Sequence, residues 1–408
     1  MLILFRFGSF IPVPGVNVVA LSNMFGQGTI VDMFNLFSGG NFARASIFAM
    51  GIMPYITSSI VMQLLGSIIP FFEKLKKEGA EGQKKLNQYT RYGTVLVGIF
   101  NAIGMAVIIY SQPDVVSMSR GLFMFTTIIS MVTGTMIVLW LGEQITEKGI
   151  GNGISLIIFA GIIAEYPRGF LMMFGMIGDG AISIPNGAGV LLLMVIVTAA
   201  VILITEATRR LNVQYPKRVV GRKVFGGQST YIPLKVNAAG VIPIIFGQSV
   251  IMIPSTIATF FPDSAFRTFM DRAFVPGAPL YMFLFMTLIV FFAYFYTAII
   301  MNPVDMADNM KKHGGFIPGI QPGKHTAAYI NNVLTRITLP GAIFFAIIAV
   351  IPDIMRIWVP NLPLYFGGTG IIIIVGVALE TLRQIESHLV MRHYDGFMKK
   401  GKLRGRQS

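Results

Sequence analysis

Nine long stretches from residue 45 onward contain no Asp, Glu, Lys or Arg, and their lengths limit what this chain can fold into. The stretches are 45–72, 92–113, 121–142, 149–164, 180–205, 236–262, 273–304, 337–352 and 357–379. About 20 apolar residues in a helix span a bilayer, so all but the two 16-residue runs are long enough alone. Those two must take in a charged residue near one end. Only 12% of residues are charged, against about 25% in soluble proteins. The sequence therefore predicts an all-α polytopic membrane protein.

The N-terminal residues 1–11, MLILFRFGSFI, form a further apolar piece that is too short to span alone. We expect it to be the end of a truncated first span, which gives ten transmembrane helices. Spans one to five and six to ten have similar layouts, and an odd number of spans in each half makes the halves inverted copies. We therefore expect two pseudo-symmetric inverted halves, residues 1–175 and 176–390, followed by a basic tail, 391–408.

Lysine and arginine gather in alternate loops. If the spans alternate in direction, 25 of the 32 Lys and Arg residues fall on one side of the membrane. Because positively charged loops remain in the cytosol, we expect this side, with the C-terminal tail, to be cytosolic. The formal net charge of +14 then reflects topology and does not indicate nucleic-acid binding.

Two loops on the basic side, 207–236 and 302–336, are long and mix glycine, proline, aromatic and basic residues. This composition predicts structured hairpins and not flexible tethers. Such loops suit the docking of a cytosolic partner, although they could also serve only to fix the topology.

The stretch 33–72 combines a short apolar segment with a spanning helix. Residues 33–37 are apolar apart from one asparagine and end at Ser38-Gly39-Gly40, so this piece is too short to cross a membrane. In the following span, Ile52, Ile56 and Ile60 recur every four residues and therefore share one helical face. Pro54 removes a backbone donor from that helix, which predicts a kink there.

The chain shows no apparatus for bond chemistry. It has no cysteine, no HExxH motif and no GxSxG motif. Its four histidines all lie in the expected cytosolic segments; they are His313, His325, His388 and His393. The run GIGNG at 149–153 follows no strand and is expected to open the fifth span. We expect no catalytic residue, no metal and no cofactor.

Two kinds of transport protein remain open. A secondary transporter for a small solute normally keeps ionisable residues at the membrane midplane. Here the carboxylates nearest the spans are predicted at span ends; they are Glu143, Glu165, Glu206, Asp353 and Glu380. A channel closed by an apolar constriction needs only aliphatic side chains, because a narrow apolar neck excludes water and ions by dewetting. The isoleucines of the second span, with Ile154 and Ile158 of the fifth, are suitable for such a neck.

Several motifs resemble the bacterial SecY family, the large subunits of the Sec protein-conducting channel. The stretches that carry the resemblance are RFGSFIPVPGVN, MFNLFSGGNFARASIFAMGIMPYITSSIVMQLL, GEQITEKGIGNGIS, GGQSTYIPLKVNAAGVIPIIF, MADNMKKHGGFIPGIQPG and YFGGTGIIIIVG. They extend in register from residue 6 to about residue 400. The resemblance implies a ten-helix channel that conducts unfolded secretory chains and releases transmembrane segments sideways through a lateral gate.

The resemblance also implies roles for particular residues. The family's pore ring falls on Ile52, Ile56, Ile154, Ile158, Ile245 and Ile373. Its plug, at about residues 30–43, falls on Phe34, Asn35, Leu36, Phe37, Ser38, Gly39 and Gly40. Gln63 and Asn237 match polar positions of the lateral gate, where an interhelical hydrogen bond between two such amides would favour closure by about 1 kcal/mol.

The resemblance implies partners as well: the SecE and SecG subunits, the SecA motor ATPase, the ribosome, substrate chains with signal sequences, and the phospholipid bilayer. No nucleic acid is implied apart from that of the ribosome. Candidate docking residues for the motor or ribosome are Arg218, Arg222, Gln321 and Lys324. Gln321 stands where the family usually has an arginine, and a neutral amide cannot replace the bidentate contacts of a guanidinium.

Overall fold

Long helices packed side by side make up most of the structure, which is a computed structural model. It describes residues 1–22, 35, 38–112, 115–215, 218–220, 223–225, 229–258, 260–261, 264–359 and 368–400. The first helices are α1 (Leu2–Gly8), α2 (Val18–Ser22), α4 (Met53–Ile68), α5 (Pro70–Lys77), α6 (Ala80–Tyr110), α7 (Arg120–Lys148), α8 (Gly153–Gly178) and α9 (Ile184–Glu206). The later elements are β1 (Thr208–Gln214), β2 (Arg218–Val220), β3 (Lys223–Phe225), β4 (Ser229–Lys235), α10 (Ile242–Ala258), α11 (Ala265–Ala273), α12 (Pro279–Ile300), α13 (Pro303–Lys312), α14 (Lys324–Trp358) and α15 (Gly368–Lys400).

All ten expected spans appear as helices in the described part of the chain. Seven helices are long and apolar enough to cross a membrane, or eight if the bent pair α4–α5 is one span. The seven are α6, α7, α8, α9, α12 continued by α13, α14 and α15. The seventh expected span is the shorter apolar helix α10, and the first is the short helix α1. The prediction of an all-α polytopic fold is confirmed.

The second span bends at a different place from the one predicted. Pro54 lies in the first turn of α4, where a missing N–H removes no hydrogen bond from the helix, so the predicted kink at Pro54 is wrong. The bend of 96° instead separates α4 from α5. Ile69 is extended there, with ψ at 121°, and Pro70 starts the new helix. The three isoleucines Ile52, Ile56 and Ile60 are all buried, as their shared face predicted.

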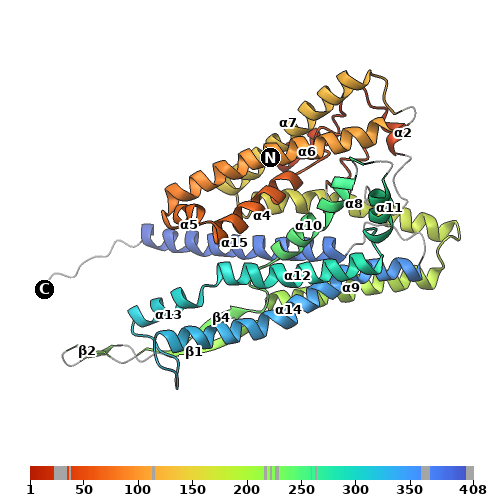
Figure 1. The fold of residues 1–408 in the computed structure, drawn as a ribbon. Helices are drawn as coiled ribbons and strands as arrows, with labels where there is room; N and C mark the ends of the chain where they lie inside the picture. The colour runs from red at the N-terminus through yellow and green to blue at the C-terminus, as the bar shows by residue number, and fades with distance from the viewer. Residues whose placement is uncertain are drawn as a thin grey trace.

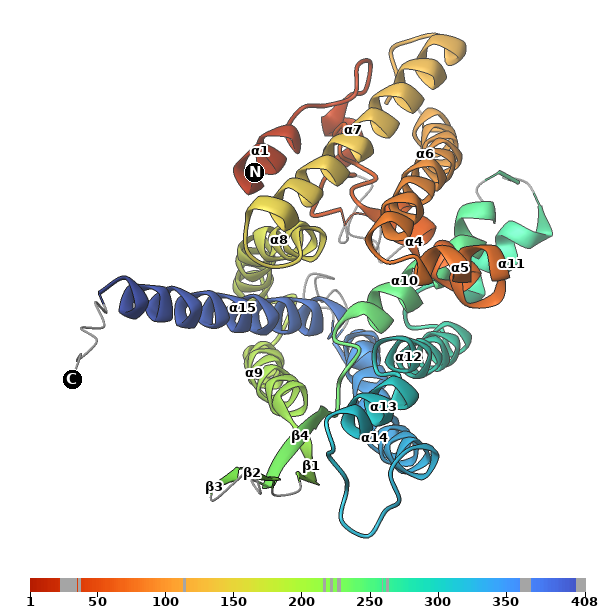
Figure 2. The same ribbon diagram turned by 90° about the vertical axis from the view of Figure 1, so that its left-hand side faces the viewer.

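The helices form two groups, one on each side of a central region (Figure 2). The group containing α1 and α4–α8 lies on one side, and the group containing α9 and α12–α14 lies on the other. α10 packs on α12, and α15 packs on α9 and α14, so both belong with the second group. Contacts between the groups include those of α4 and α6 with α10, and those of α8 with α9 and α15. The first contact is called the α4–α10 seam below.

One end of the bundle, called the basic end here, carries α5, the strands and α13 (Figure 1). The long strands β1 and β4 pair antiparallel, with Thr208 opposite Lys235, so loop 207–236 is a β-hairpin as predicted. Loop 302–336 is a helical hairpin instead, made of α13 and the start of α14. The two loops share a small hydrophobic core to which Leu211, Leu234 and Ile330 contribute.

Asparagine and serine side chains start several helices. Asn152 accepts hydrogen bonds from the backbone N–H groups of Ile154 and Ser155, at 3.1 and 3.2 Å. These bonds satisfy two of the donors left free in the first turn of a helix. The GIGNG run therefore opens the fifth span, as its sequence context predicted, and this start sets the position of the isoleucines that follow.

Candidate functional site

The six isoleucines expected in the pore ring lie in one large hydrophobic core that many helices share, five as buried members and Ile154 packed against it. They come from four helices: Ile52 and Ile56 from the start of α4, Ile154 and Ile158 from α8, Ile245 from α10, and Ile373 from α15. Since α4 and α8 lie in one group of helices and α10 joins the other across the seam, the cluster is shared between both sides of the molecule. Aliphatic side chains at such a junction can separate two aqueous spaces by dewetting.

Five of the six isoleucines are buried, and Ile154 is half-buried. The Cγ1 atom of Ile154 lies beside Gly142 of α7, because a β-carbon added at Gly142 would be 3.2 Å from it. Ile154 thus packs at the edge of the cluster, next to α7. Ile373 is fully buried and Ile158 is 4% exposed, so these two lie deeper in the cluster.

The segment expected to be the plug is described only in part. Phe34, Leu36 and Phe37 lie outside the described residues, whereas Asn35, Ser38, Gly39 and Gly40 lie within them. Residues 38–44 form a chain of turns, called the arm here. Asn35 is tied to the arm, because its side-chain oxygen accepts a hydrogen bond of 2.8 Å from the backbone N–H of Ala43.

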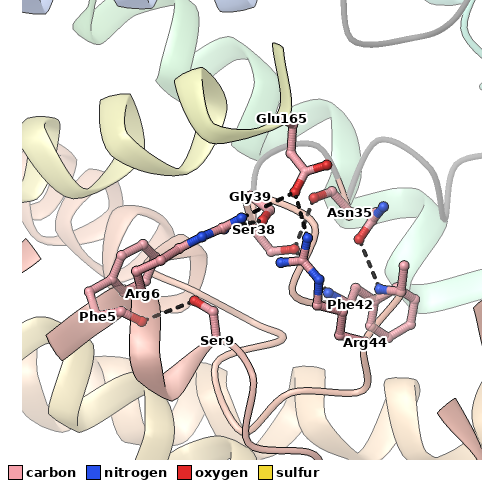
Figure 3. Close-up of polar contacts among 10 residues, drawn as sticks. Phe5, Arg6, Ser9, Asn35, Ser38, Gly39, Phe42, Arg44 and Glu165 are labelled. Carbon is pink, nitrogen blue, oxygen red and sulfur yellow. Dashed lines mark hydrogen bonds and ion pairs between the residues drawn. The ribbon is translucent and has the colours of Figure 1, made fainter. Parts of the chain in front are cut away.

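Two arginines and a glutamate form a charged cluster beside the arm (Figure 3). Glu165 of α8 is 1% exposed and pairs with Arg44 of the arm at 3.1 Å. Arg6 of α1 lies 3.9 Å from the same carboxylate oxygen. The carbons of both guanidinium groups are close to the Phe10 ring, at 5.3 and 5.0 Å from its centre.

The sequence predicts no role for this cluster and places Glu165 at the end of a span. That prediction is wrong, because α8 continues to Gly178 and Glu165 lies in the middle of the helix. The sequence did contain a signal: the uncharged run 149–164 is too short to span alone, and Glu165 is the first charged residue after it. A carboxylate buried within a helix requires a cationic partner, and residue 44 supplies it from a distant part of the chain.

The expected gate residues Gln63 and Asn237 are not hydrogen-bonded to each other; both lie in the described part of the chain. The Gln63 amide donates to Ser59, one turn earlier in α4, at 3.1 Å. Asn237 lines a small cavity of about 10 Å³ between α10, α12 and α14, together with Thr297 and Thr338. The hydrogen bond that the resemblance implied between these two amides is therefore absent from this arrangement of the helices.

The α4–α10 seam instead contains a cavity of about 230 Å³, lined by residues of α4, α6 and α10. Its lining is mostly apolar and includes Met53, Leu96 and Met252, with Asn101 as one of its few polar members. Across the seam, the Ser249 hydroxyl lies 4.0 Å from the sulfur of Met53. The two groups of helices thus meet here mainly through apolar packing.

The candidate docking residues are at the basic end. Arg218 lies in β2, and Arg222 lies outside the described residues. Gln321 and Lys324 are both exposed in the turn that leads into α14. Nearby, the Arg383 guanidinium donates to Glu206 at 2.6 Å, which ties α15 to the end of α9. Partial burial lowers the pKa of Lys235 in β4, and the charge of Arg383 lowers it further.

Comparison with known proteins places the chain in a family. The SecY family model matches residues 46–382. The chain belongs to the SecY family. It is 46% identical to the protein translocase subunit SecY of Escherichia coli K12 over 412 residues, which covers 99% of this chain and 93% of the relative. It is 42% identical to the subunit of the same name from Aquifex aeolicus, over 98% of this chain and 95% of that protein.

Solved structures share this SecY fold at low sequence identity. A structure described as a protein-conducting channel is similar with a TM-score of 0.70 and 16% identity, over 95% of this chain and 90% of the other. Sec61 in a canine ribosome–channel complex from the endoplasmic reticulum is similar with a TM-score of 0.66 and 15% identity, over the same shares of the two chains. The arrangement of two helical groups is therefore the fold of the SecY and Sec61 channels.

Proposed function

We propose that this chain is the pore-forming subunit of a SecYEG-type translocase in the bacterial inner membrane. It conducts unfolded secretory polypeptides across the membrane and releases transmembrane segments sideways into the lipid. One observation carries this proposal: six isoleucines from four helices, on both sides of the seam, lie in or against the same hydrophobic core. This is the composition expected of a seal that must close on itself and also fit around a chain of any sequence.

The mechanism is physical and requires no bond chemistry. Aliphatic side chains bind neither ions nor water strongly, so a narrow ring of them excludes both by dewetting. They also need no fixed geometry, and the ring deforms around a passing polypeptide. Sideways release uses the α4–α10 seam, where apolar packing around a cavity of about 230 Å³ is replaced by the apolar surface of a signal sequence. Gln63 and Asn237 then act as polar positions along this gate without bonding to each other in the closed state.

The proposed plug includes Asn35, Ser38, Gly39 and Gly40, which lie between α2 and α4 and block the channel on the side away from the basic end. The basic end is cytosolic in this proposal and offers Arg218, Arg222, Gln321 and Lys324 to a motor ATPase or a ribosome. SecE and SecG subunits complete the complex. Support for these partners comes from the relatives, which are named translocase subunits, and from the Sec61 channel solved with a ribosome.

A cross-linking experiment tests the pore because the chain has no cysteine of its own. We expect the I158C variant, in the complete translocase, to cross-link to a secretory chain stalled during translocation. The matched control is I163C in the same helix, because Ile163 is 43% exposed, whereas Ile158 is 4% exposed. Equal cross-linking at both positions, or none at residue 158, would overturn the assignment of the pore.

A further inference from the structure

The buried carboxylate of Glu165 stands apart from the hydrophobic pore, and its neighbours suggest a separate role. Its side chain is 1% exposed, and it has two arginine neighbours that come from different segments, α1 and the arm. Figure 3 shows both guanidinium groups directed at one oxygen of the carboxylate. A charge buried in this way has a large desolvation cost unless it is paired. The pairing with Arg44 therefore links the charge of the Glu165 carboxylate to the position of the arm.

The backbone of the arm also lies directly against α8 around Glu165. A β-carbon at Gly39 would be 2.7 Å from the Cα atom of Gly161, which is one turn before Glu165. A β-carbon at Gly40 would be 2.3 Å from the Glu165 carboxylate. Both glycines have positive φ, 70° and 76°, so the chain needs glycine here for its conformation as well as for space. The arm thus packs against one turn of α8, from Gly161 to Glu165.

Hydrogen bonds join the arm and Asn35 into one bonded unit. The Ser38 hydroxyl donates to the backbone oxygen of Asn35 at 3.0 Å, and the backbone N–H of Gly40 donates to the same oxygen at 2.8 Å. The Ala43 N–H donates to the Asn35 side chain at 2.8 Å. Because Arg44 directly follows this bonded unit, a force that holds Arg44 also holds Asn35, which belongs to the proposed plug.

The contact with α8 has few points of attachment. Arg44 donates to one oxygen of Glu165, while the second oxygen, and the Nη1 atom of Arg44, are buried without a partner among the described residues. Arg6 adds a long hydrogen bond of 3.4 Å to the backbone oxygen of Gly39. The charged contact between the arm and α8 therefore depends on one short bond, between Arg44 and Glu165.

We propose that Glu165 is a positioning residue that holds the arm against α8 through Arg44 and thereby keeps the plug in its closed position. This inference rests on the proposed function, because it takes the segment before the arm as the plug of a channel. The carboxylate does not contact the passing chain in this role. Its part is to set how readily the plug leaves when a substrate enters.

The test measures the position of the arm without requiring transport. Ala43 is buried, with 9% of its surface exposed, so an A43C thiol in the otherwise cysteine-free translocase reacts slowly with a membrane-impermeant maleimide. We expect E165Q to increase the rate of this reaction by about tenfold or more, as for the loss of a charge-assisted hydrogen bond. The same variant raises ion leak through the resting channel in planar bilayers.

Companion variants separate this role from a general loss of stability. R44Q is expected to behave like E165Q, whereas R44K keeps a positive charge and retains the slow reaction, because a lysine still pairs with a carboxylate as a point charge. The matched control is E143Q, which breaks the ion pair between Glu143 and Arg91 at 2.7 Å and leaves the arm in place. If E165Q fails to fold, the labelling rates of R44Q and R44K still test whether a positive charge at residue 44 holds the arm.

The outcomes distinguish this inference from the proposed pore. Unchanged labelling in both E165Q and R44Q overturns the role of Glu165 and leaves the pore assignment intact. Faster labelling with increased leak supports both. Faster labelling without any leak supports the contact between Glu165 and the arm but overturns the identification of the neighbouring segment as the plug.

Discussion

Gln214 and Phe316 exchange two backbone hydrogen bonds, of 2.9 and 3.0 Å, and so join the two long loops at the basic end. Gln214 is the last residue of β1, and Phe316 lies between α13 and α14. Below this bridge the loops share a hydrophobic core that includes Val213 and Ile317. The two loops are therefore joined in one surface, and we expect a partner that binds one loop to affect the position of the other.

The bridge gives a first prediction about docking. F316P removes the N–H that donates to Gln214, at a cost of about 1 kcal/mol in local stability, and loosens one loop from the other. We expect motor-driven translocation by the reconstituted translocase to fall about fivefold. F316A keeps the N–H and is the matched control, with a loss of less than about twofold. Similar rates for the two variants would show that the backbone bridge is unimportant for docking.

The proposed seal gives a second prediction. I158N places an amide in the isoleucine cluster, where Ile158 is 4% exposed, and a polar group there stabilises water in the neck. We expect resting ion conductance in planar bilayers to rise about tenfold. I163N changes an exposed position of the same helix and should conduct no more than the unmodified channel. An unchanged leak in I158N would remove Ile158 from the seal.

The sequence was sufficient to predict which segments form the apolar helices and that the isoleucines are buried. Both depend on local properties: the length of an uncharged run, and a spacing of four residues on a helix. Ile52, Ile56 and Ile60 were placed on one face from spacing alone, and all three are buried. The assignment of six isoleucines to one ring came from the resemblance to SecY, and the structure gathers them in one cluster without testing their role.

Features that depend on contacts between distant segments could not be predicted. The bend after Ile69 replaces the expected kink at Pro54, because a proline in the first turn of a helix is harmless and the start of α4 was not known. The pair of Arg44 and Glu165 joins residues 121 positions apart. Likewise, Gln63 bonds to Ser59 on its own helix, although the resemblance suggested Asn237 as its partner.

Two glycines of α7 give a third prediction, which concerns stability. A β-carbon at Gly134 would be 2.0 Å from the backbone oxygen of Ile47, whereas one at Gly121 would meet nothing within 4 Å. Backbone cannot move aside as a side chain can, so G134A is expected to destabilise the protein by about 1–3 kcal/mol. G121A should be neutral or slightly stabilising, because alanine favours a helix by up to about 1 kcal/mol.

Thermal unfolding of the detergent-solubilised protein, at one fixed scan rate, measures the difference between these variants. We expect the midpoint for G134A to lie below that of the unmodified protein and the midpoint for G121A to equal or exceed it. Equal midpoints for the two variants would mean that the segment around Ile47 does not pack closely on α7.

A fourth prediction concerns the α4–α10 seam, where the Ser249 hydroxyl lies 4.0 Å from the Met53 sulfur. If transmembrane segments leave through this seam, joining α4 to α10 covalently should block their release. We expect the double variant M53C/S249C, treated with a short bis-methanethiosulfonate cross-linker that reductant can cleave, to lose about nine-tenths of its membrane insertion activity, since the contacts there are apolar and must separate for a helix to pass. Cleavage of the linker should restore the activity.

A second pair of cysteines controls for cross-linking as such. In S58C/G93C the two positions have β-carbons about 3.4 Å apart and join α4 to α6, which lie on the same side of the seam. Cross-linking this pair should leave insertion nearly unchanged, as should each single-cysteine variant treated with the reagent. Insertion that persists after complete cross-linking of residues 53 and 249 would exclude the seam as the exit, because a helix about 10 Å wide cannot pass between two helices that are held in contact.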